Sequence, residues 1–303
     1  MNNHNQDTER TRVRTASPAI ESVELPNQVK IPYVEQGDPS GVPVLLLHGF
    51  TDSWRSFEPV LPHLPESIRA FAPTQRGHGD ASRPAAGYRV HDFATDLAAF
   101  VDALRLEAAV IVGGSSGGFV ARRFAMDHPE RTLGLVFMGS PATLGDKPGV
   151  LELWDSTISK LTDPIDPDFV REFADGTLAR PVPQEFLETM VRESLKVPAF
   201  VWKETCKGLL EDDSFGELDK IEAPTLILWG DRDAVLPRSD QESLAAAIAG
   251  SQVMVYPGAG HAFYWEEPDR VASDITTFVE DLGEGGTAAV PPDRRRIQKG
   301  HRA

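Results

Sequence analysis

The sequence predicts an α/β fold in which helices flank a mostly parallel sheet. From residue 21 to about 140, short apolar runs alternate with helical patterns, and the same alternation resumes near residue 218. The runs are continuously apolar, as in strands that are covered on both faces, and do not alternate between apolar and polar residues. Strands that alternate with helices in this way pair in parallel, because the helices form the crossover connections.

Six strands and four helices can be located from these patterns. The strands are the runs 42–47, 68–72, 108–112, 133–138, 225–229 and 252–256. Helices are expected at residues 91–104, 117–128, 239–249 and 268–282. The first of these helices has apolar residues at positions 93, 97, 100, 101 and 104, which form a stripe along one helical face.

The alternation breaks between residues 141 and 217. Seven prolines separate short helical stretches there, among scattered large apolar residues such as Trp154, Phe173 and Trp202. We interpret this segment as a small helical insertion. The prediction therefore divides the chain into an α/β core of residues 21–140 and 218–283 and an inserted helical segment of residues 141–217.

The two ends of the chain differ in composition from the core. Residues 1–20 are polar and lack the apolar stretch of a signal peptide, so we expect a disordered N-terminal arm. Residues 284–303 are basic and follow a glycine-rich stretch, which predicts a disordered basic tail, with a nucleic-acid-binding arm as the alternative.

Charge and composition narrow the class of partners. The formal net charge is −16 while both ends are net basic, so the body is strongly acidic. An acidic body argues against nucleic acid and anionic membranes as partners. No apolar run approaches the ~20 residues that span a bilayer. The single cysteine, Cys206, allows no intrachain disulfide, which fits a cytoplasmic protein.

The segment G-G-S-S-G-G at residues 113–118 carries the first chemical signal. It matches the pattern G-x-S-x-G twice, centred on Ser115 or on Ser116, and lies directly between a predicted strand and a predicted helix. A sharp strand–turn–helix with serine at its apex is a nucleophile elbow. The glycines are needed because the backbones approach closely, and the serine takes a strained conformation that exposes it. The pattern alone admits either serine.

A nucleophilic serine needs a base, and the base needs a carboxylate that orients it. With this elbow the chain order is serine, acid, histidine. His261 is the favoured base because it follows the last predicted strand in a glycine-rich loop, whereas no strand-borne acid separates His128 from the elbow. Asp231 and Asp233 both follow the strand at 225–229. Asp233 is favoured because the segment A-V-L-P after it would hold it rigidly, while Asp231 suits a turn.

The oxyanion of an acyl-transfer intermediate needs donors, commonly two backbone N–H groups. One belongs to the residue after the nucleophile. The other comes from the turn after an early strand, where L-L-L-H-G-F places the amide of Phe50. His48 in the same turn is expected to be structural and to hydrogen-bond the loop.

Five motifs occur in an order and spacing that resemble the α/β-hydrolase fold superfamily over about residues 22–282. They are H-G-F at 48–50, R-G-H-G at 76–79, G-G-S-S-G-G at 113–118, G-D-R-D at 230–233 and G-A-G-H at 258–261. The resemblance implies a mostly parallel eight-stranded sheet, with a helical cap inserted after the sixth strand at the place of residues 141–217. It also implies a catalytic triad of Ser115, Asp233 and His261, and no cofactor or metal.

The resemblance also distinguishes the two serines. The usual elbow has a glycine pair beginning two residues after the nucleophile, and only Ser115 is followed by such a pair. Ser115 is then the nucleophile, and the amide of Ser116 is the second oxyanion donor. The family usually has an acidic residue two positions before R-G-H-G, where this chain has Thr74, at a position that mainly structures the loop.

Serine at the elbow also separates the chain from epoxide hydrolases and haloalkane dehalogenases, which use aspartate there. Epoxide hydrolases also use cap tyrosines, but all four tyrosines of this chain (33, 88, 256 and 264) lie outside the predicted cap. We therefore expect a serine hydrolase that acts on a small-molecule ester or lactone of neutral, apolar character. The same residues could instead serve cofactor-free perhydrolysis, hydrolysis of a carbon–carbon bond or acyl transfer. A hydrolase-fold ligand receptor is the non-enzymatic alternative.

Overall fold

The computed structural model describes residues 18–285. Most of the predicted arm (1–20) and basic tail (284–303) lies outside these residues. Strand β1 (Ile20–Glu24) begins at the last residue of the predicted arm, and helix α9 (Pro268–Gly285) extends into the predicted tail.

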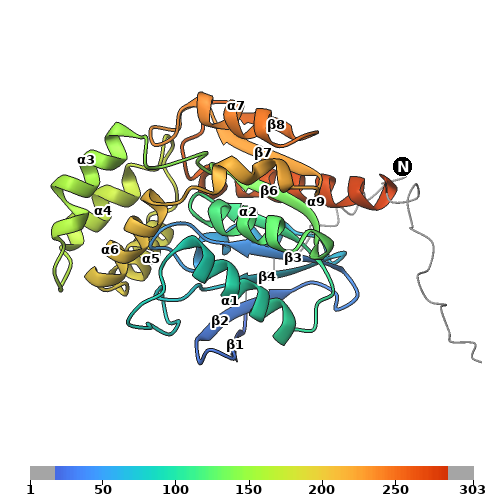
Figure 1. Ribbon diagram of the computed structural model, residues 1–303, viewed down its shortest axis with the longest axis horizontal. Helices are drawn as coiled ribbons and strands as arrows, with labels where there is room; N and C mark the ends of the chain where they lie inside the picture. Colours follow the sequence, from blue (N-terminus) through green and yellow to red (C-terminus); the bar gives the residue numbers. More distant parts are fainter. Residues whose placement is uncertain (1–17, 286–303) are drawn as a thin grey trace, which may run out of the picture.

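Eight strands form one sheet at the centre of the molecule (Figure 1). After β1 they are β2 (Lys30–Gln36), β3 (Val42–Leu47), β4 (Ile68–Pro73), β5 (Ala109–Gly114), β6 (Thr132–Met138), β7 (Thr225–Gly230) and β8 (Gln252–Tyr256). Their order across the sheet is β1-β2-β4-β3-β5-β6-β7-β8. The β1–β2 and β2–β4 pairs are antiparallel and the other pairs are parallel. The predicted eight-stranded, mostly parallel sheet is confirmed.

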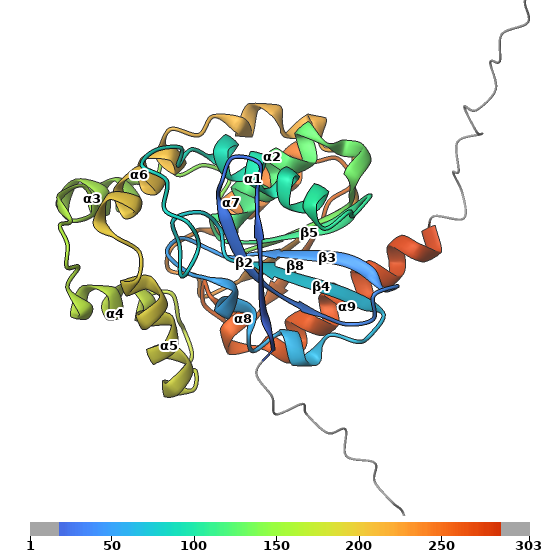
Figure 2. The same cartoon turned by 90° about the horizontal axis from the view of Figure 1, so that it is seen from below.

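Helices cover both faces of the sheet (Figure 2). One face carries α1 (Val90–Ala103), α2 (Gly117–Asp127) and α7 (Arg238–Ala247). The other face carries α9, the short helix α8 (Phe263–Glu266) and the 3₁₀ helices η1 (Trp54–Phe57) and η2 (Leu61–His63). The central strands are therefore buried on both sides.

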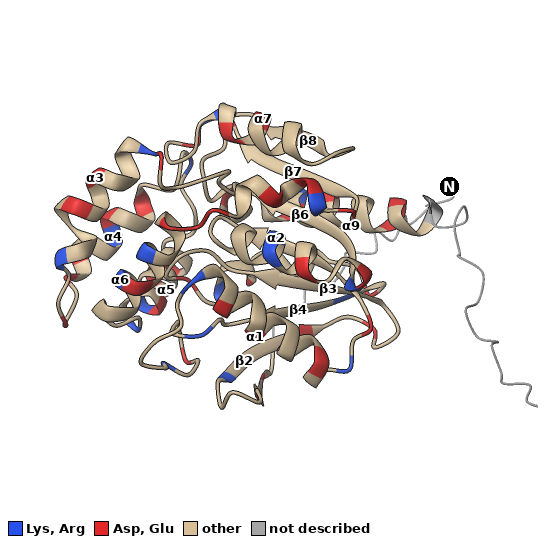
Figure 3. Ribbon diagram, viewed as in Figure 1, with Lys and Arg blue, Asp and Glu red and all other residues tan. Residues whose placement is uncertain are grey.

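Strand β3 shows why the apolar runs have no alternation. Leu45 and Leu47 pack into the core on the α1–α2 face, while Val44 and Leu46 pack into the core on the α9 face, and all four are fully buried. Because successive side chains of a strand point to opposite faces, a strand covered on both sides must be apolar at every position. The central strands β3, β5 and β7 contain no charged residue. Figure 3 shows that the charged residues lie mainly on the helices and loops around them.

Four helices lie between β6 and β7 and gather at one end of the molecule (Figure 1). They are α3 (Pro148–Ser156), α4 (Pro167–Asp175), α5 (Gln184–Leu195) and α6 (Ala199–Leu210), and a 3₁₀ turn, η4 (Ile158–Lys160), follows α3. This is the predicted helical cap after the sixth strand. A 3₁₀ helix, η5 (Ser214–Lys220), leads from the cap back to β7.

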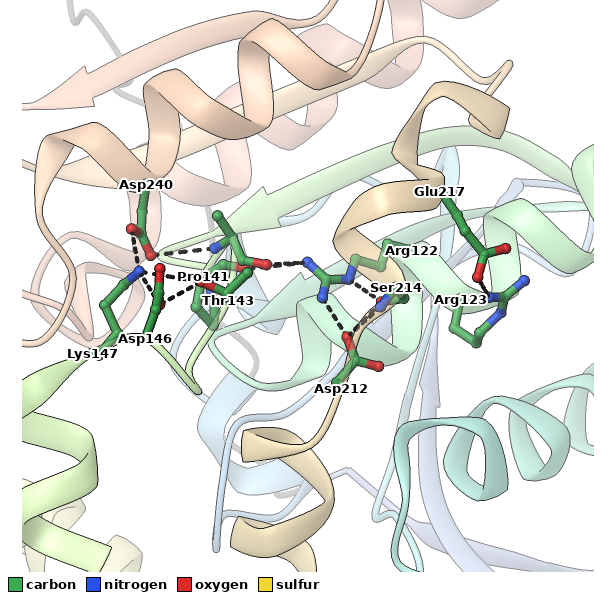
Figure 4. A network of polar contacts seen from close by, with 11 residues as sticks. Arg122, Arg123, Pro141, Thr143, Asp146, Lys147, Asp212, Ser214, Glu217 and Asp240 are labelled. Atoms are coloured by element: carbon green, nitrogen blue, oxygen red, sulfur yellow. Dashed lines mark hydrogen bonds and ion pairs between the residues drawn. The ribbon is translucent and has the colours of Figure 1, made fainter.

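A buried arginine fixes both connections between the cap and the core (Figure 4). Arg122 of α2 donates through Nη1 to the carbonyl of Ala142, which follows β6, at 2.7 Å. On the other side it donates to Oδ2 of Asp212 at 2.6 Å and to Oγ of Ser214 at 2.9 Å, just after α6. The chain that enters the cap and the chain that leaves it are therefore held by one guanidinium.

A second contact secures the entry to the cap from the side of α7 (Figure 4). The buried carboxylate of Asp240 accepts a hydrogen bond from the amide of Ala142 at 3.3 Å. Its other oxygen lies 2.9 Å from Nζ of Lys147, immediately before α3. The first residues of the cap are thus bound to two separate helices of the core.

Candidate active site

Ser115 stands at the turn between β5 and α2 with a φ of +49°. Residues with a Cβ seldom adopt this left-handed region, so the conformation marks a strained and specified turn. Its amide donates to the carbonyl of Met138 on β6 at 2.8 Å, which fixes the turn to the sheet. Strand β5 and helix α2 approach each other and strand β3 so closely at this turn that little room is left for side chains, which explains the glycines.

The packing distinguishes the two overlapping glycine patterns. A Cβ at Gly113 would lie 2.6 Å from Cα of Gly118, and a Cβ at Gly117 would lie 2.3 Å from the carbonyl oxygen of Leu47. At Gly114 a Cβ would make only ordinary contacts, the nearest at 3.5 Å. The glycines two before and two after Ser115 are therefore both sterically required, as the pattern centred on Ser115 predicts.

The three residues predicted for the triad form a continuous chain of hydrogen bonds. Oγ of Ser115 lies 2.9 Å from Nε2 of His261, and Nδ1 of His261 lies 2.8 Å from Oδ2 of Asp233. The other oxygen of Asp233 accepts from the amides of Val235 and Leu236, each at 2.8 Å. The side chain of Asp233 is fully buried, and that of His261 is 7% exposed. The A-V-L-P segment thus holds the carboxylate in place through its backbone.

The alternative residues lie elsewhere. Asp231 is exposed and accepts from the amide of Gly258 at 2.5 Å, so it structures the loop that carries His261. His128 caps the end of α2, where its ring lies against Phe124. The structure brings Asp233, and neither of these, to His261.

The two residues predicted to supply the oxyanion donors, Phe50 and Ser116, line the same cavity as Ser115. Within residues 18–285 neither the amide of Phe50 nor that of Ser116 donates to a protein acceptor. The ring of Phe50 points into the cap and packs edge-to-face on Phe173 and Trp202, with centroids 6.1 and 5.2 Å apart. Packing against the cap therefore fixes the turn that carries the first amide.

His48 is a structural residue, as predicted. It is fully buried, its Nδ1 donates to the carbonyl of Gly49 at 2.8 Å, and its Nε2 accepts from the amide of Gln75 at 2.9 Å. Burial, together with the neighbouring His78, lowers the pKa of His48 to about 3, so the ring is neutral. Thr74, where the family usually has an acid, accepts from the amide of Trp54 at 3.1 Å and ties the two loops together.

A cavity of about 300 Å³ lies between the cap and the triad. Ser115, His261 and the Phe50 turn line its core side. Most of the remaining wall is apolar and comes from the cap and the loops beside it, including Val150, Leu153, Ile158, Phe173, Met190 and Leu209. No lysine or arginine of the described chain is among the lining residues. Enclosed apolar cavities with a few convergent polar groups are typical ligand sites.

Sequence reasoning missed several polar residues of this cavity, among them Asp52 and Tyr264. Asp52 is 8% exposed, and burial raises its pKa to about 7, against the effect of a hydrogen bond from Ser56. Tyr264 is 2% exposed, and burial raises the pKa of its phenol well above the usual range. Tyr264 lies outside the cap, as predicted, and nevertheless lines the cavity because it comes three residues after His261.

Residues 18–285 contain no group of three or more His, Cys, Asp or Glu side chains arranged to hold a metal ion. None of the helices in this part of the chain is long and apolar enough to span a bilayer.

This fold, with an elbow serine hydrogen-bonded to a histidine that is in turn hydrogen-bonded to a carboxylate, defines a class of protein. Comparison with known sequences agrees with this class. The sequence profile of the α/β hydrolase fold matches residues 42–268. The chain belongs to the α/β hydrolase fold family.

Relatives with several different activities resemble the chain over most of its length. It is 30% identical to a 2-hydroxymuconate semialdehyde hydrolase of a Pseudomonas species, over 83% of this chain and 90% of that one. It is 28% identical to a non-heme haloperoxidase of Rhodococcus erythropolis, over 80% and 93%. Among solved structures, a thermophilic esterase from Thermogutta terrifontis superposes with a TM-score of 0.76 at 25% identity, covering 87% of this chain and 99% of that one.

Proposed function

We propose that this chain is a serine hydrolase that cleaves a carboxylic ester or lactone of a small to medium, apolar and uncharged molecule through an acyl-enzyme. The observation that carries the proposal is the unbroken chain of hydrogen bonds from Ser115 through His261 to Asp233 in the wall of the cavity below the cap. A serine, a base and an orienting carboxylate in this relation are the components of nucleophilic acyl transfer.

In the first half-reaction Oγ of Ser115 bonds to the carbonyl carbon while Nε2 of His261 takes its proton. Asp233 accepts from Nδ1 of His261, which holds the ring in the productive tautomer and stabilises the imidazolium. The amides of Phe50 and Ser116 donate to the oxyanion of the tetrahedral intermediate. When this intermediate collapses, the carbon–oxygen bond of the ester breaks and the alcohol leaves with the proton from His261.

In the second half-reaction water attacks the acyl-enzyme. His261 accepts a proton from this water, the carbon–oxygen bond to Ser115 breaks, and the proton returns to Oγ of the serine. The products are a carboxylic acid and the regenerated enzyme. Water is the only co-reactant, so the proposal needs no cofactor.

The cavity supports a neutral, apolar substrate. Its wall is mainly apolar, and the described lining offers no cationic side chain to a substrate carboxylate. An unpaired carboxylate would lose several kcal/mol of solvation in such surroundings. The carboxylate of Glu172, which also lines the cavity, would add repulsion.

Perhydrolysis is a second candidate, because the relative from Rhodococcus erythropolis carries the name of a non-heme haloperoxidase. Hydrogen peroxide would then take the place of water, and attack on the acyl-enzyme would release a peracid and free Ser115. Carbon–carbon bond hydrolysis and acyl transfer are further uses of the same residues. Analysis of the products with peroxide or an acyl acceptor present separates these reactions.

The test compares hydrolysis of short-chain nitrophenyl esters, and labelling by a fluorophosphonate probe, in three proteins. Ser115→Ala should lose turnover by about 10⁴- to 10⁶-fold and should take up no probe. Ser116→Ala keeps its backbone N–H and should still form the acyl-enzyme. Equal rates in the wild type and Ser115→Ala would end the proposal, and loss of labelling in Ser116→Ala alone would move the nucleophile by one residue.

A further inference from the structure

Among the polar groups in the cavity wall that have no part in the proposed reaction, two lie beside Ser115. They are the carboxyl group of Asp52, in the turn between β3 and η1, and the hydroxyl group of Tyr264, in α8. Both side chains are buried, and both line the same cavity as Ser115. They come from segments far apart in the sequence, so the fold brings them to one place.

Both groups lie beside the backbone of the proposed nucleophile. A Cβ built on Gly49 would be 3.3 Å from Oδ2 of Asp52 and also 3.3 Å from Cβ of Ser115. A Cβ built on Gly114, the residue before Ser115, would be 3.5 Å from the hydroxyl oxygen of Tyr264. The two groups therefore face the space in which the scissile bond and its nearest substituents would lie.

Each group is held firmly but keeps hydrogen-bonding capacity. Oδ2 of Asp52 accepts from Oγ of Ser56 at 2.8 Å, and the ring of Tyr264 stacks on Phe57 with centroids 5.9 Å apart. Ser56 and Phe57 both belong to η1, so one short helix positions both groups. Within residues 18–285, neither Oδ1 of Asp52 nor the hydroxyl of Tyr264 has a hydrogen-bond partner. Neither atom is among the fully buried side-chain atoms that lack a partner, and both residues line the cavity, so a substrate group can pair with them and gain affinity.

We propose that Asp52 and Tyr264 form a subsite that binds a hydroxyl group of the substrate, one or two carbons from the scissile ester group. This inference rests on the proposed hydrolase function. A hydroxyl supplies one proton, which Oδ1 of Asp52 can accept, and lone pairs, which can accept the proton of Tyr264. The substrate class is then a hydroxy ester, with the hydroxyl on the acyl or on the alcohol side.

Other polar groups fit this pair less well. A carboxylate would keep an unpaired charge among mainly apolar residues, because the described lining holds no lysine or arginine. An ammonium group has donors only, so it could not accept the proton of Tyr264. Burial also raises the pKa of Asp52 to about 7, which suppresses the negative charge that an ammonium group would need. A hydroxyl group satisfies both partners without bringing a charge into the cavity.

The experiment measures binding first, so that it does not depend on turnover. Calorimetry with Ser115→Ala compares ethyl 2-hydroxyhexanoate with ethyl hexanoate and with the 2-methoxy and 2-amino analogues. A second pair, 2-hydroxybutyl butanoate and butyl butanoate, tests the alcohol side. We expect Kd to be about 10-fold lower or better for the hydroxy member of one pair, and the methyl ether to lose this gain because it cannot donate to Asp52.

The same preference should appear in kcat/KM of proteins that retain Ser115, and two substitutions should reduce it. Tyr264→Phe should lower the preference for the hydroxy ester about 3- to 10-fold, and Asp52→Leu should remove it. Tyr88→Phe is the matched control, since it removes another buried tyrosine hydroxyl, which donates to Pro84 at 2.7 Å and does not line this cavity.

Three results would overturn the subsite: equal Kd values in both pairs, a preference that survives in Tyr264→Phe and in Asp52→Leu, or tighter binding of the amino ester than of the hydroxy ester. If Asp52→Leu fails to fold, Tyr264→Phe still decides, because it removes a single oxygen that has no partner in the described protein. Selective binding of the hydroxy ester without hydrolysis by the wild type would refute the proposed hydrolase function and leave the subsite supported.

Discussion

Asp52 makes the stability of the protein depend on pH in a direction opposite to that of most carboxyl groups. Burial raises its pKa from 3.8 to about 7 in the folded protein. In the unfolded chain the carboxyl ionises near its ordinary value. Its contribution to stability is therefore complete below about pH 4 and is lost as the pH rises from there through 7. Over this range the carboxyl group loses its proton when the protein unfolds but keeps it in the folded protein.

Asp52→Asn removes this titration while keeping an oxygen that can accept from Ser56. One pKa unit corresponds to about 1.4 kcal/mol, so the full effect of the shift is about 4 kcal/mol. We expect the free energy of unfolding of Asp52→Asn, minus that of the wild type, to rise by about 1.4 kcal/mol per pH unit between pH 5 and pH 7. The difference should level off above pH 7.

The assay is urea unfolding of both proteins at pH 5, 6, 7 and 8, with tryptophan fluorescence as the signal that monitors unfolding. Buried histidines such as His48 and His78, with pKa values lowered to about 3 and about 4, contribute in the opposite sense but cancel in the difference. Ser56→Ala is an internal control: it removes the hydrogen bond that lowers the pKa of Asp52, so its transition should move to higher pH. A difference that stays flat from pH 5 to pH 8 would refute the reasoning.

Three further predictions concern the packing of the protein. Gly117→Ala should abolish folding or activity, because its Cβ would lie 2.3 Å from a carbonyl oxygen of β3, whereas Gly216→Ala, with open space around it, should not; expression and ester hydrolysis report both. Asp212→Asn leaves the buried guanidinium of α2 unpaired and should cost about 3–5 kcal/mol in urea unfolding, against about 0–1 kcal/mol for Glu242→Gln in an exposed pair. Cys206, whose pKa burial raises to about 12, should react with Ellman's reagent only after unfolding.

Each of these has a clear opposing result. An active Gly117→Ala protein would mean that β3 and α2 can separate at the elbow. Equal losses in Asp212→Asn and Glu242→Gln would mean that the cap connections contribute nothing beyond an ordinary surface pair. Rapid labelling of Cys206 in the folded protein would mean that the reagent reaches the thiol through the cavity that Cys206 lines.

The strands that could be located from the sequence are those whose pattern follows from burial on both faces. β3 and β8 have the predicted bounds, and β4 to β7 differ by one or two residues at an end. The antiparallel pair β1 and β2 gave no comparable signal. β1 is an edge strand that is mostly exposed, and β2 contains Pro32, so pairing across the sheet rather than local pattern defines both.

The site shows the same division. Ser115, Asp233 and His261 could be proposed because each lies in a short motif with its own backbone requirement, and the fold brings them within hydrogen-bonding distance. Asp52 and Tyr264 had no such motif. Asp52 reads as an ordinary turn residue, and the environment of both arises only when η1 and α8 are packed together.

The Arg122 contacts have a consequence for how such a protein can change. Because the two ends of the inserted segment are bound to one side chain of α2, the segment between them can vary without shifting the register of the sheet, provided that the residues packed on Phe50 are kept. The selectivity of the cavity wall and the chemistry at its base are thereby separable traits. Random substitution within α3 to α6 that leaves Phe173 and Trp202 in place should accordingly change substrate preference more often than it abolishes hydrolysis.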